Sequence, residues 1–156
     1  MKPKQVLIPF LLISFILVLS TFIPLDFNPR ADLNFTKMEI EFDGVNATAT
    51  IDYDVGFLTQ VYIFLFGNRN LVPCLEDFLL SYEEVQVVSV NETKAEVRLI
   101  NSSRTVDSYA IHEGHPLGST VSTLIQIYPA TPPDTDKDIR TYTNTNATKV
   151  GIYAVG

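Results

Sequence analysis

An uncharged apolar stretch near the start of the chain, residues 6–23, is the feature that most constrains how the chain can fold. As a helix it would be about 27 Å long at roughly 1.5 Å per residue, close to the roughly 30 Å hydrocarbon core of a bilayer. It has no polar face, which argues against a core helix of a soluble protein. We therefore interpret residues 1–23 as a transmembrane anchor, in which Pro9 falls near the first turn and breaks few helix hydrogen bonds.

A cleaved secretory signal peptide is the alternative interpretation of this stretch. Signal peptides have an apolar core of about 7–15 residues, followed by a cleavage site with small residues. Here the apolar run is longer, and Val18 stands at one of the two small-residue positions that would direct cleavage after Ser20. The length of the run favours the uncleaved anchor, while removal of residues 1–20 stays open.

Charges on the two sides of the stretch predict its orientation. Lys2, Lys4 and the terminal amine precede it and favour a cytoplasmic N-terminus at the cell membrane. The rest of the chain would then be extracytoplasmic. Residues 24–36 contain two prolines and are expected to form an extended tether, which leaves residues 37–156 for one compact domain.

The composition limits the partners of this outer domain. The whole chain has 11 basic and 18 acidic residues, a formal net charge of -7, and two of the basic residues precede the apolar stretch. The outer part is therefore more acidic than the whole chain and would repel nucleic acid and anionic headgroups. Cys74 is the single cysteine, which excludes an internal disulfide; a buried inert thiol and an intermolecular disulfide are its two interpretations.

Five of the nine asparagines begin an Asn-x-Ser/Thr triplet, the acceptor pattern for N-glycosylation. They are Asn34, Asn46, Asn91, Asn101 and Asn146. Their excess over a random distribution predicts a glycosylated outer surface in a host that attaches such sugars. The alternative is that Asn favours turns and Thr favours strand starts, so that the triplet recurs where strands begin.

Alternation of apolar and polar residues predicts a sheet in the outer domain. In residues 37–43 three apolar residues alternate with charged ones, and residues 47–55 continue the pattern after a turn at Gly44. A period of two is typical of strands with one buried face, here joined as a β-hairpin. Further hairpins are predicted for residues 85–90 with 93–100 and for 139–143 with 148–155, and single strands for 106–111 and 121–128.

Two helices are predicted between the first two hairpins. Residues 57–66 have strand-favouring residue types, but their apolar residues recur at helical spacing and Gly67 suits a helix end, which favours a buried helix over a strand. Residues 73–82 begin with Pro73, which suits a first helical position, and carry an apolar stripe. Together these elements predict an α+β fold, an antiparallel sheet with one or two helices covering its apolar face.

The strongest candidate site is the loop His112-Glu113-Gly114-His115, which holds both histidines of the chain. Two imidazoles and a carboxylate could provide three ligands to a metal such as zinc and leave the fourth position to water. If a carboxylate such as Asp107 converged on the same pocket, a metal-dependent hydrolase or a metal-binding receptor would follow. However, the histidine spacing of three predicts a turn, whereas zinc proteases carry histidines at i and i+4 on a helix. A solvated or backbone-capping turn is the competing interpretation.

Other chemical motifs receive less support from the sequence. Asp134, Asp136 and Asp138 are spaced like the opening of a calcium-binding loop, but Ile139 and Thr145 stand where such a loop needs Gly and Glu. A hydrated acidic loop is the simpler interpretation. The sequence also contains no Gly-x-Ser-x-Gly nucleophile elbow and no phosphate-binding glycine loop. It therefore predicts no catalytic residue and no cofactor.

Several short strings in the outer domain, namely residues 57–67, Pro73, residues 112–118 and Tyr128-Pro129, resemble uncharacterised single-pass membrane proteins of archaea. The resemblance implies a membrane location and no activity. Taken with the acidic exterior and the glycosylation triplets, it leads us to expect a membrane-anchored cell-envelope protein with a non-enzymatic surface or interaction domain. Its partners would be the membrane and an envelope protein or glycan. A small-ligand sensor, which would need a cavity between sheet and helices, is a further alternative.

Overall fold

The computed structural model describes Ser14, Val18 and residues 32–129 and 138–155. Among these residues no helix is both long enough and apolar enough to cross a membrane. The predicted transmembrane anchor, except for Ser14 and Val18, and most of the predicted tether lie outside the described residues. The fold of residues 32–129 and 138–155 can be compared with the sequence predictions directly.

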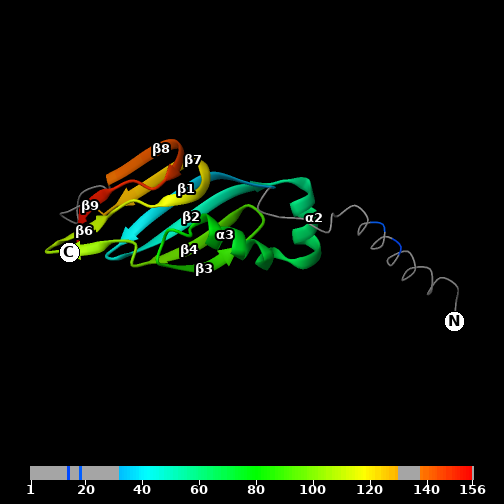
Figure 1. Ribbon diagram of the computed structural model, residues 1–156, viewed down its shortest axis with the longest axis horizontal. Helices are drawn as coiled ribbons and strands as arrows, with labels where there is room; N and C mark the ends of the chain where they lie inside the picture. The colour runs from blue at the N-terminus through cyan, green and yellow to red at the C-terminus, as the bar shows by residue number, and fades with distance from the viewer. Residues whose placement is uncertain (1–13, 15–17, 19–31, 130–137, 156) are drawn as a thin grey trace.

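Two sheets and two short helices form an α+β domain (Figure 1). The large sheet has the strand order β3-β4-β2-β1-β7-β8, and the small sheet has the order β5-β6-β9. In chain order the elements are β1 (Leu33–Asp43), β2 (Asn46–Val55), α2 (Phe57–Phe66), the 3-10 helix η2 (Asn68–Leu71), α3 (Val72–Phe78), β3 (Glu84–Val90), β4 (Lys94–Ile100), β5 (Arg104–Val106), β6 (Tyr109–His112), β7 (Pro116–Tyr128), β8 (Asp138–Ala147) and β9 (Gly151–Ala154).

The large sheet is mixed, which corrects the predicted antiparallel sheet. β1 and β7 run parallel, with Lys37 opposite Thr123 and Glu41 opposite Ile127, whereas the other neighbouring strands are antiparallel. Between β1 and β7 the chain passes through both helices, the β3–β4 hairpin and part of the small sheet, which is long enough for the crossover that parallel neighbours require. Alternation shows which residues face the core, but it carries no information on strand direction.

A β-bulge explains why β1 begins four residues before its regular alternation. The register of β1 against β2 shifts between Phe35 and Lys37, so Phe35 and Met38 are both buried although their spacing is odd. Between them, the hydroxyl of Thr36 donates a hydrogen bond to the backbone oxygen of Asp52 at 3.1 Å. Residues 33–36, predicted as the end of the tether, therefore belong to the sheet.

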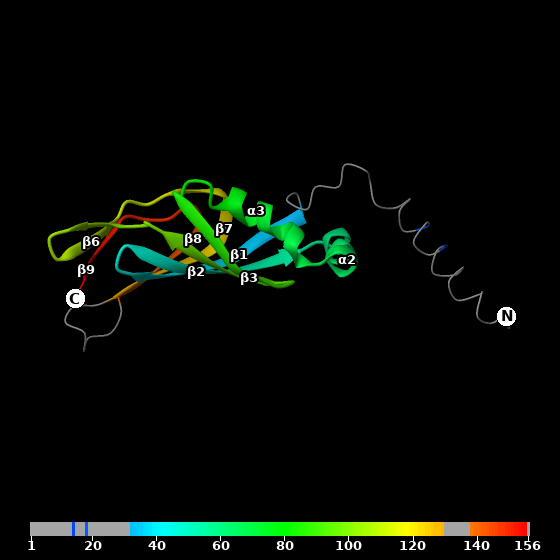
Figure 2. The same cartoon turned by 90° about the horizontal axis from the view of Figure 1, so that it is seen from below.

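The apolar face of the large sheet is covered by α3 and the segment after it. Leu75, Phe78 and Leu79 are almost fully buried, and the rings of Phe35 and Phe78 stack with centroids 3.9 Å apart. Figure 2 shows α3 over the sheet and α2 beyond its end. Residues 57–66 are thus a helix, as predicted, but the expected burial is wrong, because Thr59 and Ile63 are the two buried residues of α2.

The predicted hairpin at the end of the chain does not form, whereas the predicted β3–β4 hairpin is confirmed. β8 pairs with β7, and β9 pairs with β6 in the small sheet. The residues between β8 and β9 contact β7 and the loop before it: the Lys149 N–H donates to Gln126 Oε1 at 2.7 Å, and the Thr148 N–H donates to the His115 oxygen at 2.8 Å. These long-range hydrogen bonds direct β9 away from β8.

Candidate functional site

His112, at the end of β6, is fully buried and both of its ring nitrogens have partners. Nδ1 lies 2.8 Å from the Ser102 carbonyl oxygen, and Nε2 lies 3.2 Å from Thr148 Oγ1. Because a carbonyl oxygen can only accept, Nδ1 carries the proton of the neutral ring. Burial, the largest influence, lowers the pKa of His112 below its ordinary value of 6.5, which favours the neutral form. The ring also packs against Phe42, with centroids 4.8 Å apart, so His112 is part of the core.

Thr148 links His112 to the Tyr82 side chain and to the backbone of His115. Its Oγ1 accepts hydrogen bonds from the His115 backbone N–H at 2.6 Å and from the Tyr82 hydroxyl at 3.2 Å. The His115 ring lies against Tyr82, with ring centroids 4.4 Å apart. These contacts attach the loop between β6 and β7 to the core, which is the structural role expected of a backbone-capping turn.

The three predicted metal ligands do not form a ligand set. His112 is buried with both nitrogens occupied, whereas Glu113 is at the surface, where its Oε1 lies 2.9 Å from Nε of Arg104. Across residues 32–129 and 138–155, no group of three His, Cys, Asp or Glu side chains could hold a metal ion, so Asp107 does not complete a site either. The geometry of this loop therefore supports packing and not metal chemistry.

The calcium-like acidic pattern falls largely outside the described residues. Asp134 and Asp136 belong to the part of the chain that the structure does not describe. Asp138, at the start of β8, accepts a hydrogen bond from Arg140 Nη2 at 2.7 Å, and both side chains are exposed. This carboxylate is therefore part of a surface ion pair on β8.

Four of the five asparagines that begin the predicted glycosylation triplets lie at the surface of the domain. Asn34, Asn91, Asn101 and Asn146 are exposed, and Asn46 is half-buried. The third residues of two triplets, Ser103 and Thr148, are buried. Attachment of sugars at these five positions stays a prediction.

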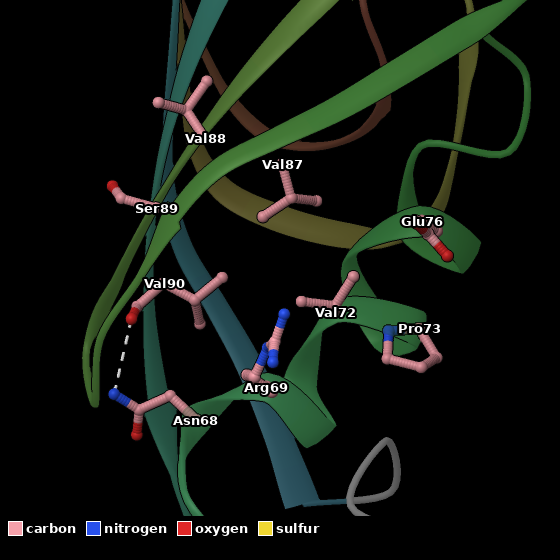
Figure 3. Close-up of a pocket in the computed structure, with 9 residues that line it drawn as sticks. All are labelled: Asn68, Arg69, Val72, Pro73, Glu76, Val87, Val88, Ser89 and Val90. Atoms are coloured by element: carbon pink, nitrogen blue, oxygen red, sulfur yellow. Dashed lines mark hydrogen bonds between the residues drawn. The ribbon is translucent and has the colours of Figure 1, made fainter.

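A groove of about 770 Å³ runs between β3 and the η2–α3 segment (Figure 3). Its walls combine apolar and polar side chains in similar amounts: Val72 and Pro73 come from α3, and Val87 and Val90 come from the side of β3 that faces them. The complete lining is Asn68, Arg69, Val72, Pro73, Glu76, Val87, Val88, Ser89 and Val90.

Arg69 places a positive charge within this groove. Figure 3 shows its guanidinium pointing into the space between β3 and α3, close to Val72. No side chain in residues 32–129 or 138–155 forms a hydrogen bond or ion pair with it. Glu76, the other charged lining residue, lies further along α3. A guanidinium beside valine side chains, with no ion pair to a described carboxylate, is suited to bind an anionic group.

β3 is an edge strand of the large sheet, so one side of its backbone is not paired with another described strand. Part of this edge is protected. The register shifts at a bulge between Val87 and Ser89, and the Asn68 side-chain amide donates to the Val90 oxygen at 3.3 Å. The C-terminal half of β3, Val87–Val90, lines the groove described above, which we call the β3 groove.

The sequence reasoning did not identify the β3 groove, although it predicted both of its walls. The helix near residues 73–82 and the strand near 85–90 were predicted separately, and their apposition depends on the order of strands in the sheet. One local signal was present: Arg69 is the single basic residue of the apolar region 57–82. A single basic residue in an otherwise apolar region indicates that its side chain occupies a defined site in the folded domain.

Comparison of the chain with protein-family models, with curated proteins and with solved structures found no match. The resemblance to single-pass membrane proteins of archaea therefore stays a prediction. Inferences about function consequently depend on the sequence and on the geometry of the described residues.

Proposed function

We propose that this chain is a membrane-anchored cell-envelope protein whose extracytoplasmic domain binds an extended segment of a partner protein and catalyses no reaction. The location is supported by the uncharged stretch of residues 6–23, the basic residues before it and the glycosylation triplets after it. The binding function is carried by one observation, the free edge of β3 beside a groove that contains Arg69.

A strand is the ligand shape that matches this edge. β3 has seven residues, so at roughly 3.3 Å per residue its backbone is about 23 Å long, and the part that the bulge and Asn68 leave unprotected could pair with a short extended segment. Hydrogen bonds between the two backbones would provide affinity regardless of sequence. Every second side chain of the segment would face the β3 groove and provide specificity.

The lining of the groove predicts the chemistry of the segment. Val72, Val87 and Val90 favour apolar side chains, and Arg69 favours one carboxylate, which a guanidinium can bind through two parallel hydrogen bonds. Glu76 on the α3 wall disfavours a second acidic residue nearby. The expected ligand is therefore an extended segment with one acidic residue and apolar residues at alternate positions.

Binding can be tested on the full chain in lipid nanodiscs, with a displayed library of seven-residue peptides as the probe. The variant Arg69→Glu reverses the charge in the groove. Arg98→Glu is the matched control, because Arg98 is exposed on β4 and alternates with Val97 and Leu99, which face the core, so it lies on the opposite face of the sheet. Hydrogen-exchange mass spectrometry of the complexes locates the bound peptide.

Selected peptides are expected to carry an acidic residue and to slow amide exchange in Glu84–Val90. Their affinity should fall by about tenfold or more in Arg69→Glu, because a charge-assisted contact is replaced by repulsion, and should be unchanged in Arg98→Glu. The proposal is wrong if no peptide binds, if the protected amides lie elsewhere, or if the two variants bind equally well.

A further inference from the structure

α2 presents its apolar side to solvent instead of to the sheet. Phe57, Phe64 and Phe66 are 75%, 86% and 61% exposed, and Leu58 and Leu65 are also exposed. None of the ten residues of the helix is charged. Phe57, Leu58, Val61, Phe64 and Leu65 recur at i, i+1, i+4, i+7 and i+8, so they form one continuous stripe along the helix. We call these five residues the α2 stripe.

The buried side of α2 is small and faces the start of the described domain. The Thr59 hydroxyl donates to Asp32 Oδ2 at 3.1 Å, and the Gly56 N–H at the N-cap donates to the Asp32 oxygen at 3.1 Å. These two bonds hold the N-terminal end of α2 against the residue at which the chain enters the domain. The α2 stripe points away from this attachment.

The chain that precedes Asp32 places this end of the domain near the membrane, if the proposed anchor is correct. Asp32 follows the last residue of the uncharged stretch, Ile23, by nine positions. Nine residues span at most about 30 Å when fully extended. α2 is therefore within reach of the membrane surface from which the chain emerges. In Figures 1 and 2, α2 lies at the end of the large sheet where β1 begins, opposite the end that carries β6 and β9.

We propose that the α2 stripe lies in the outer interface of the membrane, with its side chains among the upper parts of the lipid tails. This inference depends on the membrane anchor of the proposed function. Helices with Phe and Leu on one face bind at the boundary between headgroups and acyl chains, and the binding strengthens with the apolar area that is buried. α2 lacks the charged face that such helices usually carry, so burial of its apolar side chains alone would hold it there. The domain would then contact the membrane through α2, and the small sheet would lie at the end of the domain furthest from the membrane.

Local charges predict which lipids this contact requires. The turn between β3 and β4 lies beside Phe64, and its Glu92 shares a surface depression with that ring. α2 itself contributes no Lys or Arg. Attraction to anionic headgroups is therefore not a part of this contact, and a zwitterionic bilayer should be sufficient.

The chain contains no Trp, so a single introduced Trp reports on one position without background. The test uses the full chain in phosphatidylcholine vesicles, with and without added phosphatidylglycerol. Phe64→Trp places the probe on the α2 stripe. Tyr109→Trp is the matched control, because Tyr109 is 54% exposed on β6 in the small sheet. Vesicle flotation is measured on the same samples and reports whether the chain is held by the membrane.

For Phe64→Trp we expect blue-shifted emission and quenching by tail-brominated lipids at least about threefold stronger than for Tyr109→Trp, in both lipid mixtures. If the chain floats with the vesicles but both probes are quenched equally by aqueous iodide, the α2 contact is wrong and the anchor stands. If the chain does not float, the anchor fails and the inference fails with it. A blue shift without lipid quenching, dependent on protein concentration, would show that a second copy covers the stripe and would also overturn the inference.

Discussion

Thr148 connects three segments of the domain through one hydroxyl group. Its Oγ1 contacts His112 Nε2, the Tyr82 hydroxyl and the His115 backbone N–H, at 3.2, 3.2 and 2.6 Å. The same residue ends the glycosylation triplet that begins with Asn146. Its hydroxyl is buried in the folded domain, so recognition of this triplet by a glycosylating enzyme would have to precede complete folding.

Replacement of Thr148 by Val should therefore lower the free energy of unfolding by about 1–3 kcal/mol, because buried hydrogen-bonding groups lose their partner while the side-chain volume is kept. Asn146→Gln is the control, since it removes the same triplet at an exposed position of β8. Urea unfolding of the full chain in detergent micelles measures both. Equal stability of the two variants would contradict the structural role of the hydroxyl.

His112 predicts a pH dependence of stability. Its pKa in the folded domain is below the ordinary value of 6.5, mainly because burial disfavours the charged ring. As the pH falls below 6.5, His112 becomes protonated in the unfolded chain but not in the folded domain. The contribution of His112 to the free energy of unfolding is therefore fully present above pH 6.5 and decreases as the pH falls. The expected slope is at most about 1.4 kcal/mol per pH unit.

The measurement compares urea unfolding of the full chain in micelles near pH 7.5 and near pH 5.5, about one unit to either side of the ordinary imidazole pKa. His112→Gln cannot titrate and should lose this part of the pH dependence, while its stability near neutral pH is lower because a buried ring is replaced. An unchanged pH profile in the variant would show that His112 does not contribute to it.

At the scale of elements, the two helices have different roles. α3 supplies Leu75 and Phe78 to the core, whereas α2 has most of its apolar side chains at the surface. The two helices are separated by Gly67 and η2, yet they differ in how they contact the sheet. α3 therefore contributes to stability through burial, and α2 does so much less.

Substitution of one leucine in each helix tests this difference. Leu75→Ala should lower the free energy of unfolding by about 2–5 kcal/mol, because it removes a fully buried side chain and leaves a cavity. Leu65→Ala, on the exposed side of α2, should change it by less than about 0.5 kcal/mol. Thermal unfolding in micelles followed by circular dichroism measures both, and similar losses for the two variants would place α2 in the core.

At the scale of the whole molecule, excess negative charge opposes compaction. The formal net charge is -7, and the ion pairs Lys37–Glu39, Lys94–Asp52, Arg104–Glu113 and Arg140–Asp138 are all solvent-accessible. Exposed pairs of this kind contribute little to stability. The excess of carboxylates over cations therefore produces a net repulsion that opposes folding of the domain.

Salt should consequently stabilise the domain. Raising the ionic strength from a few millimolar to about 0.15 M shortens the screening length to roughly 8 Å and weakens repulsion between separated charges more than it weakens contacts within a pair. The midpoint of urea unfolding should rise with sodium chloride. Potassium chloride is the control for specific cation binding and should give the same rise. A falling midpoint would mean that the surface ion pairs stabilise the domain by more than the net charge destabilises it.

Local sequence patterns predicted much of the fold because they depend on neighbouring residues alone. The inward positions of β1, β2 and β4 follow from period-two alternation, and Met38, Ile51 and Val97 are fully buried as that pattern requires. The helical spacing in residues 57–66 and Pro73 at the start of the next helix were sufficient to predict α2 and α3. Such signals identify an element and its apolar side.

Strand partners and burial depend on residues far apart in the chain. The parallel pairing of β1 with β7, the separation of β8 from β9 and the exposure of α2 result from which elements reach the sheet and in what order. The candidate sites follow the same rule. The two histidines were visible in the sequence, but the ring nitrogens of His112 contact Ser102 and Thr148 in the folded domain, whereas the β3 groove forms only because the segment that carries Arg69 lies beside β3.

The sequence by itself determined the elements of this protein and the uncharged stretch on which its proposed location depends, since period and composition are properties of contiguous residues. The tertiary structure alone decided strand direction, the packing role of His112, the outward face of α2 and the β3 groove. Each of these requires groups distant in the chain to meet, and their free energy depends on the surroundings that the whole fold creates.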